Sequence, residues 1–242
     1  MGRSMPSLAK SVKSTDARKR HARSVAPRKP RASGLSRERI VAETLAVLRA
    51  NPTEQLTIAR AGAAVGATSM AIYRHFRDGA DLADAILAKV LDGLSEEIPR
   101  QADWRAQVRA WMEAIYRRLT ETPQSVGMLT NSGGLSLAWV RASAVLQRCL
   151  AAGGLERAQL AEAVFWISLT VAGFAQQTLT TPLETQIQGT IDGINRLEPD
   201  EIAELSSTAA EVPRMYTQAI DIMFERTLAS IEMLIAQKDR CG

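Results

Sequence analysis

Hydrogen-bonding and basic side chains lie close together between Ser69 and His75. Ser69 is small and polar, and Met70 is flexible, so both suit contacts with the edges of nucleic-acid bases in a groove. Tyr73, Arg74 and His75 follow after Ala71 and Ile72 and offer donors to phosphate oxygens. These groups can act together only if a helix presents them on one side, so the flanking sequence must build that helix.

The flanking sequence predicts a helix-turn-helix. Helical patterns over residues 58–65 and 69–76 are separated by Gly66-Ala67-Thr68, a break that leaves room only for a tight turn. Thr57 can cap the first helix, Thr68 or Ser69 can cap the second, and Gly66 supplies the backbone freedom of a sharp helix exit. Ile72 and Phe76 lie four residues apart, so they share the face that turns toward a core.

Residues 36–91 resemble the DNA-binding domain of the tetracycline-repressor (TetR) family of bacterial transcription regulators. Gly66-Ala67-Thr68 followed by Ile72-Tyr73-Arg74-His75-Phe76 is similar to the family's Gly-Val-Ser turn and Leu-Tyr-x-His-Phe helix end. The chain departs from the family where Ala61-Gly62 replaces a frequent Ile-Ala, and a glycine inside a helix costs about 1 kcal/mol against alanine. Gly79 replaces a frequent phosphate-contacting lysine.

The resemblance also implies a helical C-terminal domain. In the family, two long helices per subunit form a four-helix dimer interface, and a cavity binds a small inducer. Residues 156–180 and 213–237 match those dimer helices by position, and the apolar side chains of the first are spread widely around the helix. A fully buried helix in a monomer is the alternative. The founding repressors bind magnesium–tetracycline through a C-terminal-domain histidine, but this chain has only His21 and His75, so we expect no metal.

Helical periodicity continues along the chain, and the fold class is predicted to be all-α. Residues 1–35 form a basic arm expected to be disordered, residues 36–92 the helix-turn-helix domain, and residues 93–242 a helical ligand-binding and dimerisation domain. Ser36 is a candidate N-cap of the helix before the helix-turn-helix. Asp78 is a candidate N-cap of a fourth helix, predicted over residues 80–91. Further helices are predicted over residues 104–120, 124–129, 135–152, 156–180, 199–210 and 213–237, with a long loop over 181–197.

Charge is distributed unevenly along the 242 residues. The basic arm holds ten Lys and Arg against one Asp, or +9, so the rest carries +4 minus +9, or −5. A basic arm beside a helix-turn-helix favours contact with DNA, although such arms are often only solubilising tails. No secretory signal or membrane-spanning stretch is recognised, and the most apolar run, residues 164–175, indicates a buried helix. Two cysteines, Cys149 and Cys241, indicate a reducing cytoplasm.

Little in the sequence suggests catalysis. Neither histidine belongs to the C-terminal region, and no Gly-x-Ser-x-Gly, Walker or Gly-x-Gly-x-x-Gly motif occurs. We therefore expect no enzyme activity and no cofactor.

The C-terminal region is rich in aromatic and soft apolar side chains, which suit an apolar or aromatic ligand as a group, although any one of them is more often core. The candidate ligand-binding residues are Trp104, Trp111, Met112, Tyr116, Met128, Trp139, Phe165, Trp166, Phe174 and Gln177. The candidate DNA-binding residues are Arg37, Arg39, Thr57, Thr68, Ser69, Met70, Tyr73, Arg74 and His75.

These observations predict a cytoplasmic, homodimeric regulator that binds a palindromic DNA operator and leaves it when a small-molecule inducer binds. A repressor is the expected form, with no membrane partner and with association to the nucleoid when DNA is bound. A non-specific nucleoid-type protein that binds DNA through the basic arm is the alternative.

Overall fold

The computed structural model describes residues 34–131 and 134–241. Disorder is predicted for residues 1–35, of which residues 1–33 lie outside the described residues. Leu35 is partly buried and packs against the core. Residues Leu35–Gly242 group into one compact unit. The boundary that we place at residue 92 stays a prediction.

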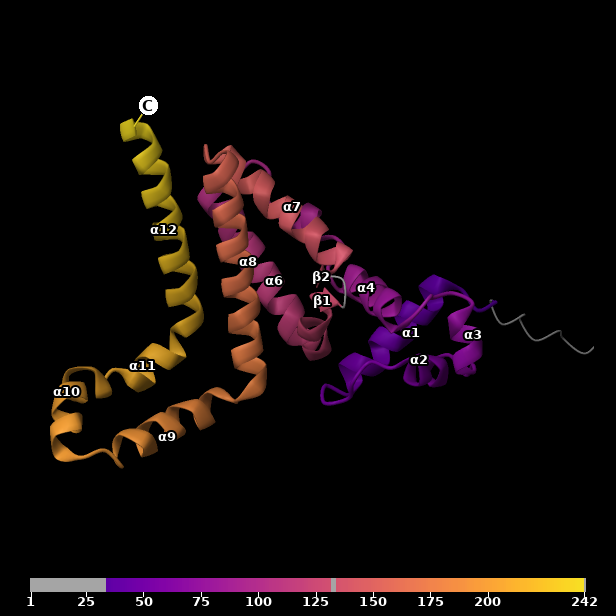
Figure 1. Cartoon of the computed structure of the whole chain (residues 1–242), viewed down its shortest axis with the longest axis horizontal. Coiled ribbons are helices and arrows are strands. Elements are labelled where there is room, and N and C mark those ends of the chain that lie inside the picture. The colour runs from indigo at the N-terminus through magenta and orange to yellow at the C-terminus, as the bar shows by residue number, and fades with distance from the viewer. Residues whose placement is uncertain (1–33, 132–133, 242) are drawn as a thin grey trace, which may run out of the picture. The chain divides into compact units, whose positions relative to one another are not determined.

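Helices dominate this unit, which confirms the all-α prediction (Figure 1). In chain order they are α1 (Arg37–Ala50), α2 (Ile58–Ala64), α3 (Ser69–Tyr73), α4 (Gly79–Val90), α5 (Leu94–Glu97), α6 (Trp104–Glu121), the 3-10 helix η1 (Pro123–Met128), α7 (Leu137–Ala152), α8 (Arg157–Thr180), α9 (Leu183–Ile194), α10 (Pro199–Ala209), α11 (Val212–Thr217) and α12 (Ala219–Cys241). A short antiparallel pair, β1 (Thr130–Asn131) and β2 (Gly134–Leu135), precedes α7.

The predicted caps are present at the first four helices. The side chains of Ser36, Thr57, Thr68 and Asp78 each accept a hydrogen bond from the backbone N–H three residues on. Gly66 leaves α2 with a φ of 66°, in the left-handed region where glycine is favoured. These local signals mark where α1 to α4 begin.

A shared apolar core joins α1, α2, α3 and α4. Ile72 and Phe76 are buried in it, as their spacing predicts, together with Ile40 and Leu48 from α1 and Ile86 from α4. The second helix of the motif ends at Tyr73 rather than at Phe76, and residues 74–76 form a turn that still brings the Phe76 ring into the core.

Four predictions about the elements of the C-terminal part were wrong. The expected loop over 181–197 contains α9, because Leu183, Ile187, Ile191 and Ile194 recur at helical spacing and outweigh two glycines. The last helix is divided at Gln218 into α11 and α12. Residues 124–129, expected to be helical, form most of a 3-10 helix that begins at Pro123, and residue 135 belongs to β2 rather than to α7.

α8 has one buried and one exposed face. Ile167, Val171 and Ala175 are fully buried, whereas Phe165 and Trp166 are 68% and 52% exposed. The expectation of a buried helix is therefore only half right. α8 is long and apolar enough to cross a membrane, with a mean hydropathy of 1.4. This is weak evidence for a membrane span, because the core helix of a soluble protein can have the same length and composition.

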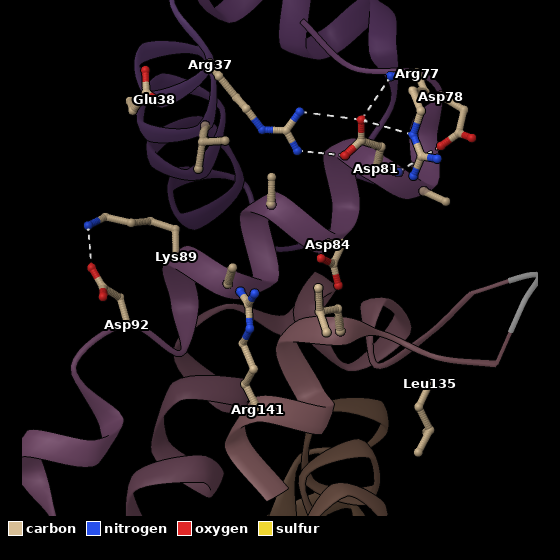
Figure 2. A pocket seen from close by; sticks show the side chains of 15 residues that line it. Arg37, Glu38, Arg77, Asp78, Asp81, Asp84, Lys89, Asp92, Leu135 and Arg141 are labelled. Atoms are coloured by element: carbon tan, nitrogen blue, oxygen red, sulfur yellow. Dashed lines mark hydrogen bonds and ion pairs between the residues drawn. The ribbon is translucent and has the colours of Figure 1, made fainter. Parts of the chain in front are cut away.

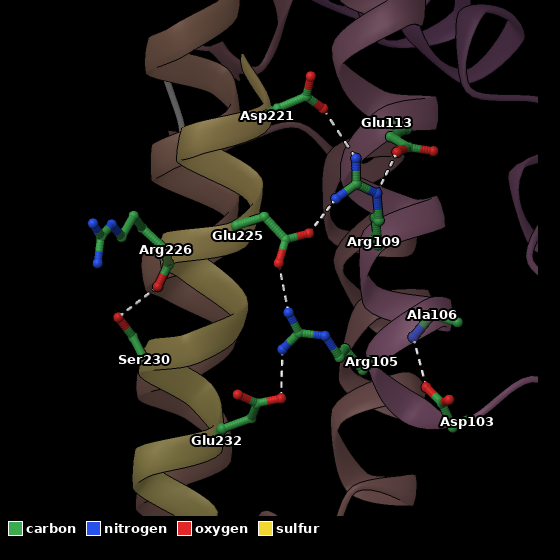
Figure 3. A network of polar contacts seen from close by, with 10 residues as sticks. All are labelled: Asp103, Arg105, Ala106, Arg109, Glu113, Asp221, Glu225, Arg226, Ser230 and Glu232. Atoms are coloured by element: carbon green, nitrogen blue, oxygen red, sulfur yellow. Dashed lines mark hydrogen bonds and ion pairs between the residues drawn. The ribbon is translucent and has the colours of Figure 1, made fainter. Parts of the chain in front are cut away.

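Arginines of α6 bind acidic residues of α12 (Figure 3). Arg105 contacts Glu225 at 2.6 Å and also binds Glu232, while Arg109 contacts Asp221 at 3.0 Å and also binds Glu225. The apolar part of the same interface includes the buried Phe224 and Leu228. These contacts hold α12 against α6.

Gly62 occupies a position where the chain approaches itself closely. A Cβ atom there would lie 2.7 Å from the carbonyl oxygen of Ala67, and the Ala67 N–H donates to the Gly62 carbonyl at 2.8 Å. Glycine at this position, where the family frequently has alanine, therefore allows the turn to pack closely against α2.

We predict that Gly62→Ala lowers the free energy of unfolding by about 1–3 kcal/mol, because the added methyl group overpacks the turn although alanine favours helices. Urea unfolding followed by circular dichroism measures this change. Gly79→Ala is the matched control, since no atom lies within 4 Å of the added Cβ in the first turn of α4. Equal effects of the two substitutions would show that the close approach at Gly62 is not a constraint.

Candidate nucleic-acid interface and ligand pocket

One face of α3 is presented to solvent while the other is locked into the core. Met70 is 70% exposed and Tyr73 is 50% exposed, whereas Ile72 on the opposite side is fully buried. Thr68 and Ser69 are exposed at the start of the same helix. A rigid helix start that carries small polar and flexible apolar side chains is suited to reading base edges in a major groove.

The other predicted DNA-binding residues border this face. Thr57 and Arg74 are exposed, while Arg39 and His75 are half-buried. Their contact with DNA stays a prediction.

Arg37 has an internal role that the sequence did not reveal. Its guanidinium binds the Asp81 carboxylate at 2.6 Å (Figure 2). It also donates to the His75 carbonyl oxygen at 2.7 Å. It also lies 4.2 Å from the centre of the Phe76 ring. The hydrogen bond between Arg37 and Asp81 lowers the pKa of Asp81 and raises the pKa of Arg37. Arg37 therefore joins α1, the turn that follows α3, and α4, and its charge is largely satisfied within the protein.

A charged cleft of about 950 Å³ lies between α1, α4 and the beginning of α7 (Figure 2). Its ionic groups are largely paired with one another: Asp81 with Arg37 and Arg77, and Asp92 with Lys89 at 2.8 Å. Asp84 accepts a hydrogen bond from the Ala138 N–H at 3.1 Å, which ties α4 to the start of α7. No local pattern in the sequence indicates this cleft, because its lining comes from elements far apart in the chain.

A second, more apolar pocket of about 440 Å³ lies in the C-terminal part, between α6, α8, α9, α11 and α12. Three predicted ligand-binding residues line it: Tyr116, Phe174 and Gln177. The rest of its wall includes residues of α9 and α11, which the sequence analysis did not assign to the site. We call this space the α8–α12 pocket.

The remaining candidate ligand-binding residues lie elsewhere. Trp111, Met112 and Trp139 are buried in the core, where the Trp111 indole N–H donates to the Ala142 carbonyl at 3.0 Å. The Trp104 ring packs against Gly153, Met128 lines a hollow beside α2 and α4, and Phe165 and Trp166 are on the exposed face of α8. Trp111 and Trp139 are therefore core residues, in agreement with the alternative that any one of these aromatic residues is more often core.

Two polar side chains connect the end of α6 and η1 to the helix-turn-helix region. Arg118 donates to the carbonyl oxygens of Val90 and Asp92 at 2.8 and 2.7 Å, and it binds Glu97 at 2.7 Å. The amide nitrogen of Gln124 lies 3.0 to 3.2 Å from four carbonyl oxygens at the end of α1 and in the loop that follows: Leu48, Asn51, Pro52 and Glu54. Both side chains therefore bind backbone carbonyls at or just after a helix end.

Within the described residues, no group of three or more His, Cys, Asp or Glu side chains is placed to hold a metal ion.

The sequence matches no protein-family model and no curated protein. Solved structures are similar over most of the chain. ActR from Streptomyces coelicolor, without ligand, has a TM-score of 0.67 and 17% identity, covering 84% of this chain and 99% of that chain. A possible TetR family transcriptional regulator from Streptomyces coelicolor A3(2) has a TM-score of 0.66 and 18% identity, covering 82% and 100%.

BioQ, solved with its natural double-stranded DNA operator, has a TM-score of 0.54 and 18% identity, covering 81% of this chain and 99% of that chain. ActR has also been solved in complex with (S)-DNPA and with actinorhodin. The chain therefore has the fold of the TetR-family transcriptional regulators.

Proposed function

We propose that the protein is a homodimeric, ligand-responsive transcriptional repressor of the TetR family that binds a palindromic DNA operator. The observation that carries this proposal is the exposed face of α3, with Met70 and Tyr73 outside and Ile72 and Phe76 fixed in the core. BioQ, which shares this fold, has been solved with its operator, and this supports the same use of the fold here. We place the protein in the bacterial cytoplasm, associated with the nucleoid when bound to DNA.

The exposed face of α8 supports a dimer. Phe165, Trp166 and Leu169 are all more than half exposed, as is Met233 on the adjacent α12. Apolar side chains concentrated on a long helix indicate an interaction surface. A second copy of the chain is the proposed partner, because two-fold symmetry is needed for two recognition helices to read a palindrome.

The α8–α12 pocket is the proposed inducer site. Its volume is within the range of small-molecule sites, and Tyr116, Phe174 and Gln177 combine apolar surface with polar groups. The ligand complexes of ActR support a small-molecule site in this fold.

α6 provides a physical connection between this pocket and the DNA-binding helices. Tyr116 lines the pocket, and Arg118, two residues later, holds the end of α4. Gln124 follows in η1 and holds the end of α1. A displacement of α6 by ligand would therefore act on the ends of α1 and α4, the two helices that support α3.

Release of DNA requires that ligand prefer one conformation over the other. A coupling of 1 to 3 kcal/mol is typical of allosteric proteins, which corresponds to roughly 5- to 150-fold in affinity. In the DNA-bound state the two recognition helices would be separated by about one helical turn, roughly 34 to 36 Å, or a multiple of it. In the ligand-bound state α4 would move and the separation would no longer match.

The exposed face of α3 generates the first of two predictions about DNA binding. Met70→Ala should relax sequence preference, because Met70 is placed for base contact, whereas Tyr73→Phe should weaken binding to all duplexes by a similar factor through loss of a phosphate contact. Fluorescence anisotropy on the preferred duplex and on an unrelated duplex of equal length measures both effects. If neither substitution alters either affinity, α3 is not the recognition helix.

The coupling generates the second prediction. Arg118→Ala should speed amide hydrogen exchange at the end of α4 and weaken operator binding about tenfold, because the Val90 and Asp92 carbonyls lose their donor. Arg117→Ala is the matched control, since Arg117 is adjacent and binds Glu97 and Glu121 but no α4 carbonyl. Hydrogen exchange with mass spectrometry and anisotropy give the two measurements. Identical behaviour of the two variants would remove Arg118 from the coupling.

The charge of the basic arm favours a second candidate, a non-specific nucleoid-type DNA-binding protein. In that case the +9 arm would supply the affinity through phosphate contacts alone, and binding would show no sequence preference. The fixed, exposed face of α3 would then have no function in DNA reading.

A further inference from the structure

The lining of the α8–α12 pocket has an uneven charge. It contains one cationic side chain, Arg226, and no carboxylate. Around Arg226 the wall is mostly apolar and aromatic, with Phe174, Ile220 and Met223 among the lining residues. A site of this composition favours a ligand with an apolar body and a negative charge.

The neutral polar groups of the pocket already have partners inside the protein. The Tyr116 hydroxyl donates to the Thr178 hydroxyl at 3.1 Å, and the Gln177 side-chain amide donates to the Gln186 side-chain oxygen at 3.2 Å. The Tyr216 hydroxyl lies 3.2 Å from the Thr190 hydroxyl. These hydrogen bonds hold the side chains in the pocket wall and leave them less hydrogen-bonding capacity for a ligand.

Arg226 differs from Arg105 and Arg109, the two arginines of α6 that bind α12. Arg105 and Arg109 each bind two or more carboxylates, and Figure 3 shows Arg226 extending from α12 away from that network. Among the residues that the structure describes, the Arg226 guanidinium has no ion-pair partner. Its planar set of N–H donors matches the geometry of a carboxylate.

We propose that the α8–α12 pocket takes a small amphipathic acid, whose aromatic or aliphatic body fills the apolar cavity and whose acid group binds Arg226. This assignment of a ligand class rests on the proposed role of the pocket as the inducer site. Arg226 is a specificity-determining residue in this proposal, because it selects acids over neutral molecules of the same shape.

Two fluorescent probes with nearly the same aromatic body provide the test. 8-Anilinonaphthalene-1-sulfonate carries one negative charge, and N-phenyl-1-naphthylamine is its uncharged counterpart. We expect Arg226→Gln to weaken sulfonate binding about tenfold and to change binding of the neutral probe by less than about twofold. Arg226→Lys should retain part of the preference, because it keeps the charge but loses the planar donors.

Two further variants fix the location of binding. Arg214→Gln removes the same charge from an exposed residue of α11 that binds Glu211, outside the pocket lining, and should leave both probes unaffected. Ala219→Trp should fill the pocket and weaken both probes together. Binding that Ala219→Trp does not change would place the probes elsewhere, for example on the exposed face of α8, and would overturn the proposal.

Other outcomes also decide the matter. Equal loss of both probes in Arg226→Gln, or weaker self-association with an unchanged probe preference, would show that Arg226 serves folding or the dimer rather than ligand selection. Operator binding is measured on the same samples without probe. Intact operator recognition with no acid preference would overturn only the ligand class, whereas acid preference without sequence-specific DNA binding would overturn the regulator.

Discussion

The proposed DNA-binding surface depends on how a five-residue helix, α3, is held in place. α3 is far too short to be stable alone in water, so its position is set by the packing of Ile72 and Phe76 and by the ion pair between Arg37 and Asp81. The Arg37 guanidinium stacks on the Phe76 ring and also binds the backbone at His75. One cluster therefore fixes the recognition helix against both α1 and α4, and any movement of those helices must move α3 as well.

α6 organises the C-terminal part in a comparable way. One side of it carries Arg105 and Arg109, which bind α12, and its end carries Tyr116 in the pocket and Arg118 at α4. α6 therefore contacts the proposed inducer site, α12 and the end of α4. This arrangement gives a physical basis for linking ligand binding to the spacing of two recognition helices, because packed helices change position in discrete steps rather than by continuous deformation.

Local chemistry made the helix-turn-helix predictable, and long-range packing made the pocket less so. Caps such as Thr57 and Thr68 and the turn glycine Gly66 act within a few residues, so the sequence alone located them. The internal role of Arg37 depends on Asp81, 44 residues away, and no local signal indicates that pair. Aromatic residues likewise give no sign of whether they fill a core, as Trp111 does, or line a cavity, as Phe174 does, until α9 and α11 are placed.

Sequence-specific recognition through α3 is tested by selection of random duplex DNA, at low and at moderate salt, on the intact chain and on a chain that lacks residues 1–33 of the basic arm. Both chains should select the same palindromic motif, and the motif should survive at the higher salt. Loss of the basic arm should lower affinity and flatten its salt dependence without changing the motif. Salt-sensitive binding without any motif, abolished by removal of the basic arm, would contradict the account and establish a non-specific DNA-binding protein.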